Sequence, residues 1–322
     1  MRRSRSHGVN HRFSAQAPAA VVMVRPHAFR SNPDTLQDNA FQSTGSTKTH
    51  ADIAASAYAE VSTMVESLRD EGVTVHVFED TGEHTPDAVF PNNWFSTHGG
   101  GHIAIYPMAT PSRQRERRWD VIDLLKKNYR VQDVIDYSGL EQDQVYLEGT
   151  GAMVLDHIDR VAYVARSNRA DPLALERFCT HFNFEPMLFD AADAHARAVY
   201  HTNVLMCIGT DFAMAGFDMI TDSSRRQQVR DRLLENGRSL IELTETQIGE
   251  FAGNALEVQG TNGRLLAIST RALRALRADQ IKILERAVAL LPLDVPTLEL
   301  AGGSVRYMLA GIHLKPRPAP RA

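Results

Sequence analysis

The stretch YHTNVLM (residues 200–206) places a lone histidine, His201, at the start of an apolar, strand-like run, and similar surroundings recur along the chain. Counting outward, Glu148 lies 53 residues before His201 and Asn254 lies 53 residues after it. A further step in each direction reaches Asn93, 55 residues before Glu148, and Tyr307, 53 residues after Asn254. This period is far too long for helix or strand geometry, so it indicates repeated supersecondary units.

Five units closed around an axis would bring these five polar residues to one central point. Each interval holds two or three strand-like runs and one amphipathic helix, and no Pro/Gly/Ser-rich linker divides the body. We therefore predict one α/β domain, a closed ring of five units around a pseudo-fivefold axis, rather than a doubly wound sheet. A chance recurrence of selected residues is the competing interpretation.

Hydrophobic periodicity places the individual elements. Strands are predicted at residues 20–24, 73–78, 102–106, 152–155, 161–165, 203–208, 212–215, 255–259, 265–269 and 305–310. Helices are predicted at residues 51–71, 113–128, 172–182 with Asp171 as N-cap, 224–236 and 270–291. The glycines at 99–101 indicate a hairpin turn, and neither they nor residues 301–304 match a nucleotide-binding fingerprint.

Composition excludes several classes of partner. The 322 residues carry a net charge of −4, which gives no reason to expect nucleic acid or a membrane surface as a partner. Two cysteines, Cys179 and Cys207, cannot build a disulfide framework, and we expect a cytoplasmic protein. We predict a disordered basic extension at 1–19, whose Arg/Ser bias is also found in mitochondrial transit peptides, an ordered domain at 20–314 and a flexible tail at 315–322.

Two polar segments suggest binding of a planar nitrogen-rich group. Asn92 and Asn93 end a strand-like run, and adjacent carboxamides offer both donors and acceptors to a urea-like group. An ordinary Asn-Asn turn is the alternative. Glu148 lies in YLEGTG (146–151), where glycines allow close approach of the backbone to a ligand. Its carboxylate could fix a guanidinium or ureido N–H, or orient a base, and a solvated turn is the alternative.

His201 is the candidate for proton transfer near neutral pH, although a lone histidine beside an apolar run is more often structural. It has no Cys or His partner at metal-ligand spacing, so we predict neither a metal nor a cofactor. Tyr307, taken by itself, is an aromatic residue in a strand.

Several segments in this order resemble the guanidino-group-modifying superfamily of arginine deiminase, dimethylarginine dimethylaminohydrolase and the glycine amidinotransferases. The segments are MVRPHAF, PDAVFPNNWFSTH, YLEGTG, ARSNRAD, YHTNVLMCIG and GGSVRYMLAGIHL. They look closest to the amidinotransferase-related branch that contains citrulline-utilisation hydrolases. The resemblance spans about residues 21–314 and implies a five-bladed ββαβ propeller of the pentein type, with the active site on its axis.

The resemblance also implies a mechanism. In the family, a cysteine attacks the central carbon of a guanidinium or ureido group, and a histidine protonates the leaving amine and then activates water. His201 matches that histidine, and Glu148 matches the carboxylate of a Glu-Gly-Gly-type motif. The remaining candidates for substrate binding are Asn93, where many members carry Asp, together with Asn92, Asp87, Arg166, Arg169 and Asn254. An Asn can donate as well as accept, which favours neutral citrulline over cationic arginine.

The departure from the family pattern is at the nucleophile. The pattern Gly-Gly-x-x-Arg-Cys-Met becomes Gly-Gly-Ser-Val-Arg-Tyr-Met, so Tyr307 takes the place of the cysteine. A phenol has a pKa near 10 and is the poorer nucleophile at neutral pH. We expect a hydrolase-type protein for a small guanidino or ureido amino acid, releasing ornithine or citrulline plus ammonia, with an impaired covalent step. A non-catalytic binding protein and an amidinotransferase are the alternatives, and self-association is left open.

Overall fold

Five three-stranded sheets account for the strands of the computed structural model, which describes residues 14–35, 39, 41–42 and 49–318. In each sheet an antiparallel pair of strands is extended by a third strand that runs parallel to its neighbour. The sheets are β3 (Phe95–His98), β4 (His102–Ile105) and β5 (Asp133–Asp136); β6 (Met153–Asp156), β7 (Val161–Ala165) and β8 (Glu185–Phe189); β9 (Met206–Ile208), β10 (Phe212–Ala215) and β11 (Ser239–Glu242); β12 (Leu256–Gly260), β13 (Gly263–Ser269) and β14 (Ala289–Leu293); and β15 (Ala310–Gly311), β1 (Ala20–Pro26) and β2 (Thr74–Asp80).

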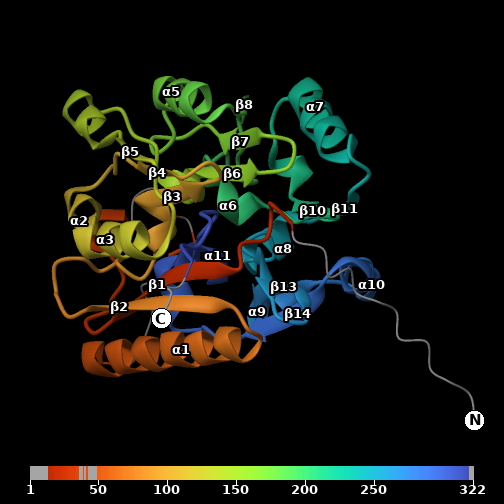
Figure 1. Ribbon diagram of the computed structural model, residues 1–322. Helices are drawn as coiled ribbons and strands as arrows, with labels where there is room; N and C mark the ends of the chain where they lie inside the picture. Colours follow the sequence, from red (N-terminus) through yellow and green to blue (C-terminus); the bar gives the residue numbers. More distant parts are fainter. Residues whose placement is uncertain (1–13, 36–38, 40, 43–48, 319–322) are drawn as a thin grey trace, which may run out of the picture.

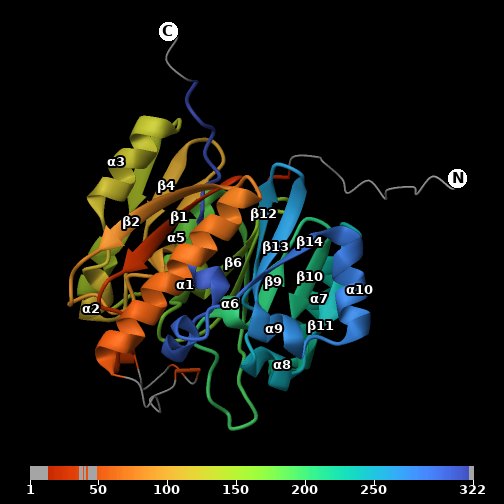
Figure 2. The same ribbon diagram turned by 90° about the horizontal axis from the view of Figure 1, so that it is seen from below.

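One helix of at least ten residues crosses between the two parallel strands of every sheet, as a parallel connection requires. These helices are α1 (His50–Asp70), α3 (Trp119–Asn128), α5 (Pro172–Phe182), α7 (Ser223–Leu234) and α10 (Ala278–Ala287). They lie around the outside of the sheets (Figure 1), and α1 covers β1 and β2 on one side of the molecule (Figure 2). Strand β1 is covered on both faces, since its residues Val21, Val22 and Met23 are all fully buried.

Short helical turns lead into the first strand of four sheets. They are η2 (Pro91–Asn93) before β3, α4 (Gly149–Ala152) before β6, α6 (Thr202–Leu205) before β9 and α11 (Val305–Met308) before β15. The turns pack on one another, because α4 contacts both η2 and α6, and α11 contacts η2. Glu148 and His201 are the N-cap residues of α4 and α6, so the repeat spacing delivers both side chains to the same inner region.

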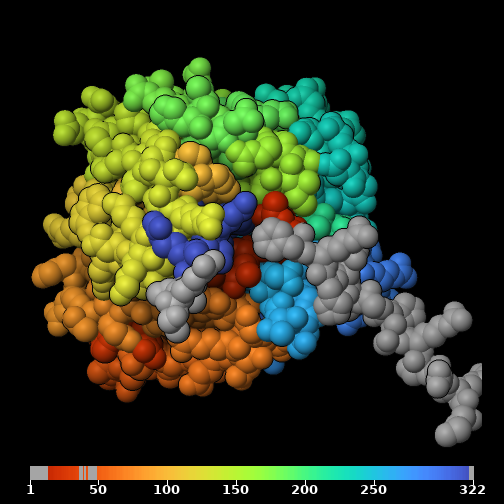
Figure 3. Space-filling view, viewed as in Figure 1, coloured from red at the N-terminus to blue at the C-terminus, as the bar shows by residue number. Residues whose placement is uncertain are grey.

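The fifth sheet unites the two ends of the chain, because β15 pairs with β1 at Val22 and Ala310. The N-terminal and C-terminal segments accordingly lie together near the middle of one face (Figure 3). Gln16 donates to the carbonyls of Leu155 and Ile208, both at 3.0 Å, and the Arg130 amide donates to Lys315. Gln16 belongs to the predicted extension, and Lys315 belongs to the predicted tail. The other residues of these two segments that are not described are 1–13 and 319–322.

Many sequence predictions of local structure are confirmed. Helix α5 has the predicted bounds, and its N-cap Asp171 accepts a hydrogen bond from the Leu173 amide. The glycines at 99–101 form the turn between antiparallel β3 and β4. Within the described residues, no helix is long and apolar enough to cross a membrane.

Several other predictions were wrong. The strand predicted at 305–310 is mostly the helical turn α11, and the first part of the strand predicted at 203–208 is α6. The helix predicted at 270–291 divides into α9 (Thr270–Ala275), α10 and the start of β14, which pairs with β13. The helix predicted at 113–128 divides into α2 (Pro111–Gln114) and α3. Apolar periodicity in such short segments does not separate helix from strand, and pairing with a neighbouring strand decides.

Gly149 allows α4 to approach η2 closely, and replacing it tests this packing. Its φ is +46°, and an added Cβ would lie 2.6 Å from the Asn92 carbonyl oxygen. We expect Gly149→Ala to lower the free energy of unfolding by about 1–3 kcal/mol, measured by urea denaturation. Gly99→Ala is the matched control, because an added Cβ there meets nothing within 4 Å. Equal losses in the two variants would contradict this account.

Candidate active site

Glu148 is the centre of a fully buried polar cluster. One carboxylate oxygen accepts from the Ala109 amide at 3.0 Å, and the other accepts from His201 Nε2 at 2.9 Å. The guanidinium groups of Arg169 and Arg113 lie 3.5 and 3.6 Å from the second oxygen. Burial alone would raise the pKa of Glu148, but the charge of Arg169, the His201 hydrogen bond and the charge of Arg113 together lower it well below its usual value. The carboxylate is therefore ionised at neutral pH.

His201 links Glu148 to Tyr307. Burial lowers the pKa of His201 to about 4, against the opposing effect of Glu148, so the ring is neutral near pH 7. Because a carboxylate can only accept, Nε2 carries the proton and Nδ1 faces the Tyr307 hydroxyl at 3.0 Å. The Tyr307 hydroxyl also lies 3.1 Å from that of Tyr200, which donates to the Gly302 carbonyl. His201 is thus a neutral histidine whose acceptor nitrogen, Nδ1, faces the side chain at position 307. Such a histidine is suited to proton transfer.

Asn93 and Asn92 adjoin this cluster from η2, and both are fully buried. In the orientation that satisfies its neighbours, the Asn93 amide oxygen accepts from Arg113 Nη1 at 2.7 Å and its nitrogen donates to the Asn92 side-chain oxygen at 2.7 Å. The Asn92 side-chain nitrogen has no hydrogen-bond acceptor among the described residues. An added Cβ at Gly151 would lie 2.5 Å from Asn93 and 2.9 Å from His201, which shows how closely the two side chains converge.

A small cavity of about 10 Å³ lies beside Tyr307, and Asp87, Arg113, Arg169 and His201 line it. Asp87 is buried and accepts from the Asn32 side chain at 2.8 Å, and burial raises its pKa. The Tyr307 ring packs edge-on against Phe90, 5.5 Å between centroids. This space is at the lower limit for a single water molecule, and the Tyr307 side chain forms part of its wall.

Two predicted site residues lie elsewhere. Asn254 uses its amide to bridge neighbouring turns, because it donates to the Asn203 carbonyl at 2.8 Å and accepts from the Ser304 amide at 3.1 Å. Arg166 is exposed and pairs with Asp190 at 3.1 Å. Neither residue lines the cavity at Tyr307, and neither contacts Glu148 or His201 through a side-chain hydrogen bond as Tyr307 and Arg169 do; Glu148, Asn92 and Asn93 also lie behind the lining rather than in it.

Arg113, Glu116 and Tyr200 belong to the cluster but were missed as site residues. Arg113 makes two hydrogen bonds of 3.0 Å to the buried Glu116, whose pKa burial raises to about 8. The surrounding run SRQRERR (112–118) has the composition of a solvated helix, so no sequence signal marks Arg113. Tyr200 directly precedes His201 and was available as a candidate. Among the residues that the structure describes, no group of three or more His, Cys, Asp or Glu side chains could hold a metal ion.

Comparison with sequence families gives one match. The family described as "N,N dimethylarginine dimethylhydrolase, eukaryotic" matches residues 25–314. Among curated proteins, no sequence matches the chain. The predicted resemblance to the guanidino-group-modifying superfamily is thus confirmed, whereas the citrulline branch stays a prediction.

Solved structures of the same superfamily share the fold at low sequence identity. The apo structure of ArgZ, an arginine dihydrolase from the ornithine-ammonia cycle in cyanobacteria, has a TM-score of 0.70 at 15% identity, covering 93% of this chain. The chain spans 41% of that protein and 97% of a mutant N-terminal domain of ArgZ bound to substrate, with a TM-score of 0.69 and 15% identity. A dimethylarginine dimethylaminohydrolase adduct gives 0.63 at 12% identity, covering 91% of this chain and 99% of that one.

The neutral state of His201 predicts a pH dependence of stability. An unfolded histidine with a pKa near 6.5 takes up a proton between pH 6.5 and 4 that folded His201 does not, so stability falls as the pH decreases through this window. His201→Phe removes this contribution. We expect the stability difference between wild type and His201→Phe to shift by roughly 2 kcal/mol between pH 7 and pH 5, measured by urea denaturation. Parallel pH profiles would show that His201 is not held neutral.

Proposed function

Because the chain belongs to the N,N-dimethylarginine dimethylhydrolase family, we propose that its buried cluster is a guanidino or ureido C–N hydrolase site in which Tyr307 interrupts the covalent step. The observation that carries this proposal is the hydrogen-bonded series Glu148, His201 and Tyr307. A thiol at position 307 would be placed beside the acceptor nitrogen of a histidine whose tautomer is fixed by a carboxylate, an arrangement suited to nucleophilic catalysis.

In the proposed reaction His201 Nδ1 takes the proton of the attacking thiol at position 307, passes it to the leaving amine and later activates water, while Glu148 orients the His201 ring. Asn92 supports a binding role, because its buried side-chain nitrogen is available to donate to a ureido oxygen. Asn93, Asp87 and Arg169 are proposed to complete the binding site. Asn254 and Arg166 are proposed to act indirectly, Asn254 through the backbone of α6 and α11, which carry the reacting residues.

Tyr307 is a poor replacement for a cysteine. Burial and the neighbouring Tyr200 raise the pKa of its hydroxyl well above the ordinary value, so the phenolate nucleophile is not available at neutral pH. Cys207 and Cys179 do not substitute for it, because burial raises the pKa of each thiol to about 12 and neither lines the cavity at Tyr307.

The charge balance of the site favours a neutral ureido substrate such as citrulline. Arg113 and Arg169 supply two cations, Glu148 is ionised, and burial raises the pKa values of Asp87 and Glu116. An additional guanidinium would place a third cation near Arg113 and Arg169, whereas a neutral ureido group would not. Relatives are described as arginine and dimethylarginine hydrolases, so arginine and dimethylarginine belong in every assay.

We also propose that the five sheets form one closed pseudo-symmetric propeller extending over residues 20–314 and that the protein works in the cytoplasm. The common strand order of the sheets and the union of both chain ends in one sheet support closure. The low cysteine content supports the location.

Tyr307→Cys tests the proposed hydrolase. We expect the wild type to give no turnover and Tyr307→Cys to convert citrulline to ornithine, ammonia and carbon dioxide, measured as ammonia release and by mass spectrometry of the amino acids. Adding His201→Asn to Tyr307→Cys should lower this rate by roughly 10²–10⁴-fold.

Tyr307→Ala is the control, since it opens the same space without supplying a nucleophile, and it should show no turnover. Absence of activity in Tyr307→Cys on citrulline, arginine and dimethylarginine would overturn the proposed reaction class. Ordinary enzymatic rates in the wild type would overturn the role assigned to Tyr307.

A non-catalytic binding protein is the second candidate, favoured by the retained Glu148–His201 pair beside a residue, Tyr307, that is a poor nucleophile. In that case the wild type should be stabilised by an amino-acid ligand without converting it. A ligand at 100 times its Kd should raise the free energy of unfolding by about 2.7 kcal/mol. Thermal denaturation of wild type and Tyr307→Ala with citrulline and arginine measures this, and unchanged melting of both variants would exclude such binding.

A further inference from the structure

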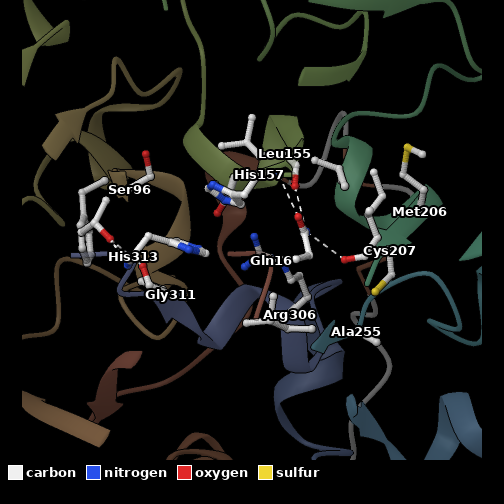
Figure 4. A pocket seen from close by; sticks show the side chains of 17 residues that line it. Gln16, Ser96, Leu155, His157, Met206, Cys207, Ala255, Arg306, Gly311 and His313 are labelled. Carbon is white, nitrogen blue, oxygen red and sulfur yellow. Dashed lines mark hydrogen bonds between the residues drawn. The ribbon is translucent and has the colours of Figure 1, made fainter. Parts of the chain in front are cut away.

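A second polar cavity, of about 40 Å³, lies where the first strands of all five sheets meet. Its walls include residues of β3, β6, β9, β12 and β15, and it shares no lining residue with the cavity at Tyr307. Figure 4 shows Arg306, Gln16, His157 and His313 around this space. The cavity is therefore separate from the proposed catalytic site, although Arg306 directly precedes Tyr307 in α11.

Among the residues that the structure describes, Arg306 has no anionic partner in this cavity. Among the described residues, its guanidinium donates one hydrogen bond, from Nη1 to the Leu309 carbonyl at 3.0 Å. Within the described part of the chain, no carboxylate lies within 4.0 Å of its guanidinium, whereas the buried Arg113, Arg238 and Arg264 each pair with at least one carboxylate. Burial lowers the pKa of Arg306 to about 10, so the group is still a cation at neutral pH. Arg306 is only partly exposed, so a counter-ion bound in the cavity would stabilise its charge where solvent reaches it incompletely.

The other polar side chains of the cavity do not supply that counter-ion. His157 and His313 stack at 3.8 Å between ring centroids, and burial lowers the pKa of both, that of His313 to about 4. The rings are thus neutral near pH 7, and each has one N–H. The Gln16 amide is occupied, because it donates to two carbonyls and its oxygen accepts from the His157 amide. The lining offers a cation and neutral polar groups but no carboxylate.

We propose that this cavity binds one small monovalent inorganic anion of the size of chloride, held by the Arg306 guanidinium. A water molecule needs about 10–15 Å³ of such space, so the cavity has room for one small ion and a water or two but not for a phosphate ester or an amino acid. The proposal goes beyond the hydrolase and does not depend on the chemistry at position 307.

Thermal denaturation in chloride, with gluconate replacing it at constant ionic strength, tests the site. We expect the wild-type Tm to rise on the order of 2–5 °C between chloride-free buffer and 0.3 M chloride, because an ion that binds only the folded state stabilises it. Arg306→Met should lose this response, and Arg274→Met, which removes an exposed arginine of α9, should keep it.

Crystals of the wild type soaked in bromide provide a test that needs no variant. An anomalous-scattering peak within about 3.5 Å of the Arg306 guanidinium is expected. A chloride response that is equal in wild type and Arg306→Met, no response in the wild type, or no bromide peak at Arg306 would each overturn the proposal.

Discussion

The ionised carboxylate of Glu148 is the constraint on which the inner structure depends. A buried carboxylate is costly unless hydrogen bonds and opposite charges surround it, and here the Ala109 amide, His201, Arg113 and Arg169 all do so. These partners come from separate segments of the chain, so satisfying one charge requires those segments to come together in one arrangement. The contacts that neutralise Glu148 therefore also hold the inner turns together.

The same charge sets the chemistry of its neighbours. The bond from His201 Nε2 to Glu148 fixes the tautomer and turns Nδ1 towards position 307. Burial lowers the pKa of His201, and the two arginines that keep Glu148 ionised add to this effect, so His201 is neutral. A thiol would find a base in this arrangement. The Tyr307 phenol forms a hydrogen bond with His201, and its ring packs against Phe90. These contacts accommodate the Tyr307 side chain, but they do not make its hydroxyl a reactive nucleophile.

The sequence predicted the parts of the fold that local pattern determines. Helix α5 was found with its N-cap, and the repeat spacing located the inner turns at Glu148, His201 and Tyr307. The third strands β5, β8, β11 and β14 were missed, because they are partly exposed and carry polar residues such as Asp133 and Glu242. They are strands because a parallel neighbour supplies their hydrogen bonds, and that partner lies across a helix in the sequence.

Equal spacing predicts equivalent positions of the backbone, but it does not predict what each side chain does there. Asn254 occupies the fourth repeat position and binds the backbone at Asn203 and Ser304, so it holds together the turns that carry His201 and Tyr307. Arg113 lies outside the repeat series and nevertheless contacts both Glu148 and Asn93. A repeat alone would have assigned chemistry to the first residue and none to the second. The contacts show that Asn254 joins two backbone segments and that Arg113 lies beside a buried charge, because the neutralisation of such a charge depends on which side chains reach it and not on the interval at which they occur.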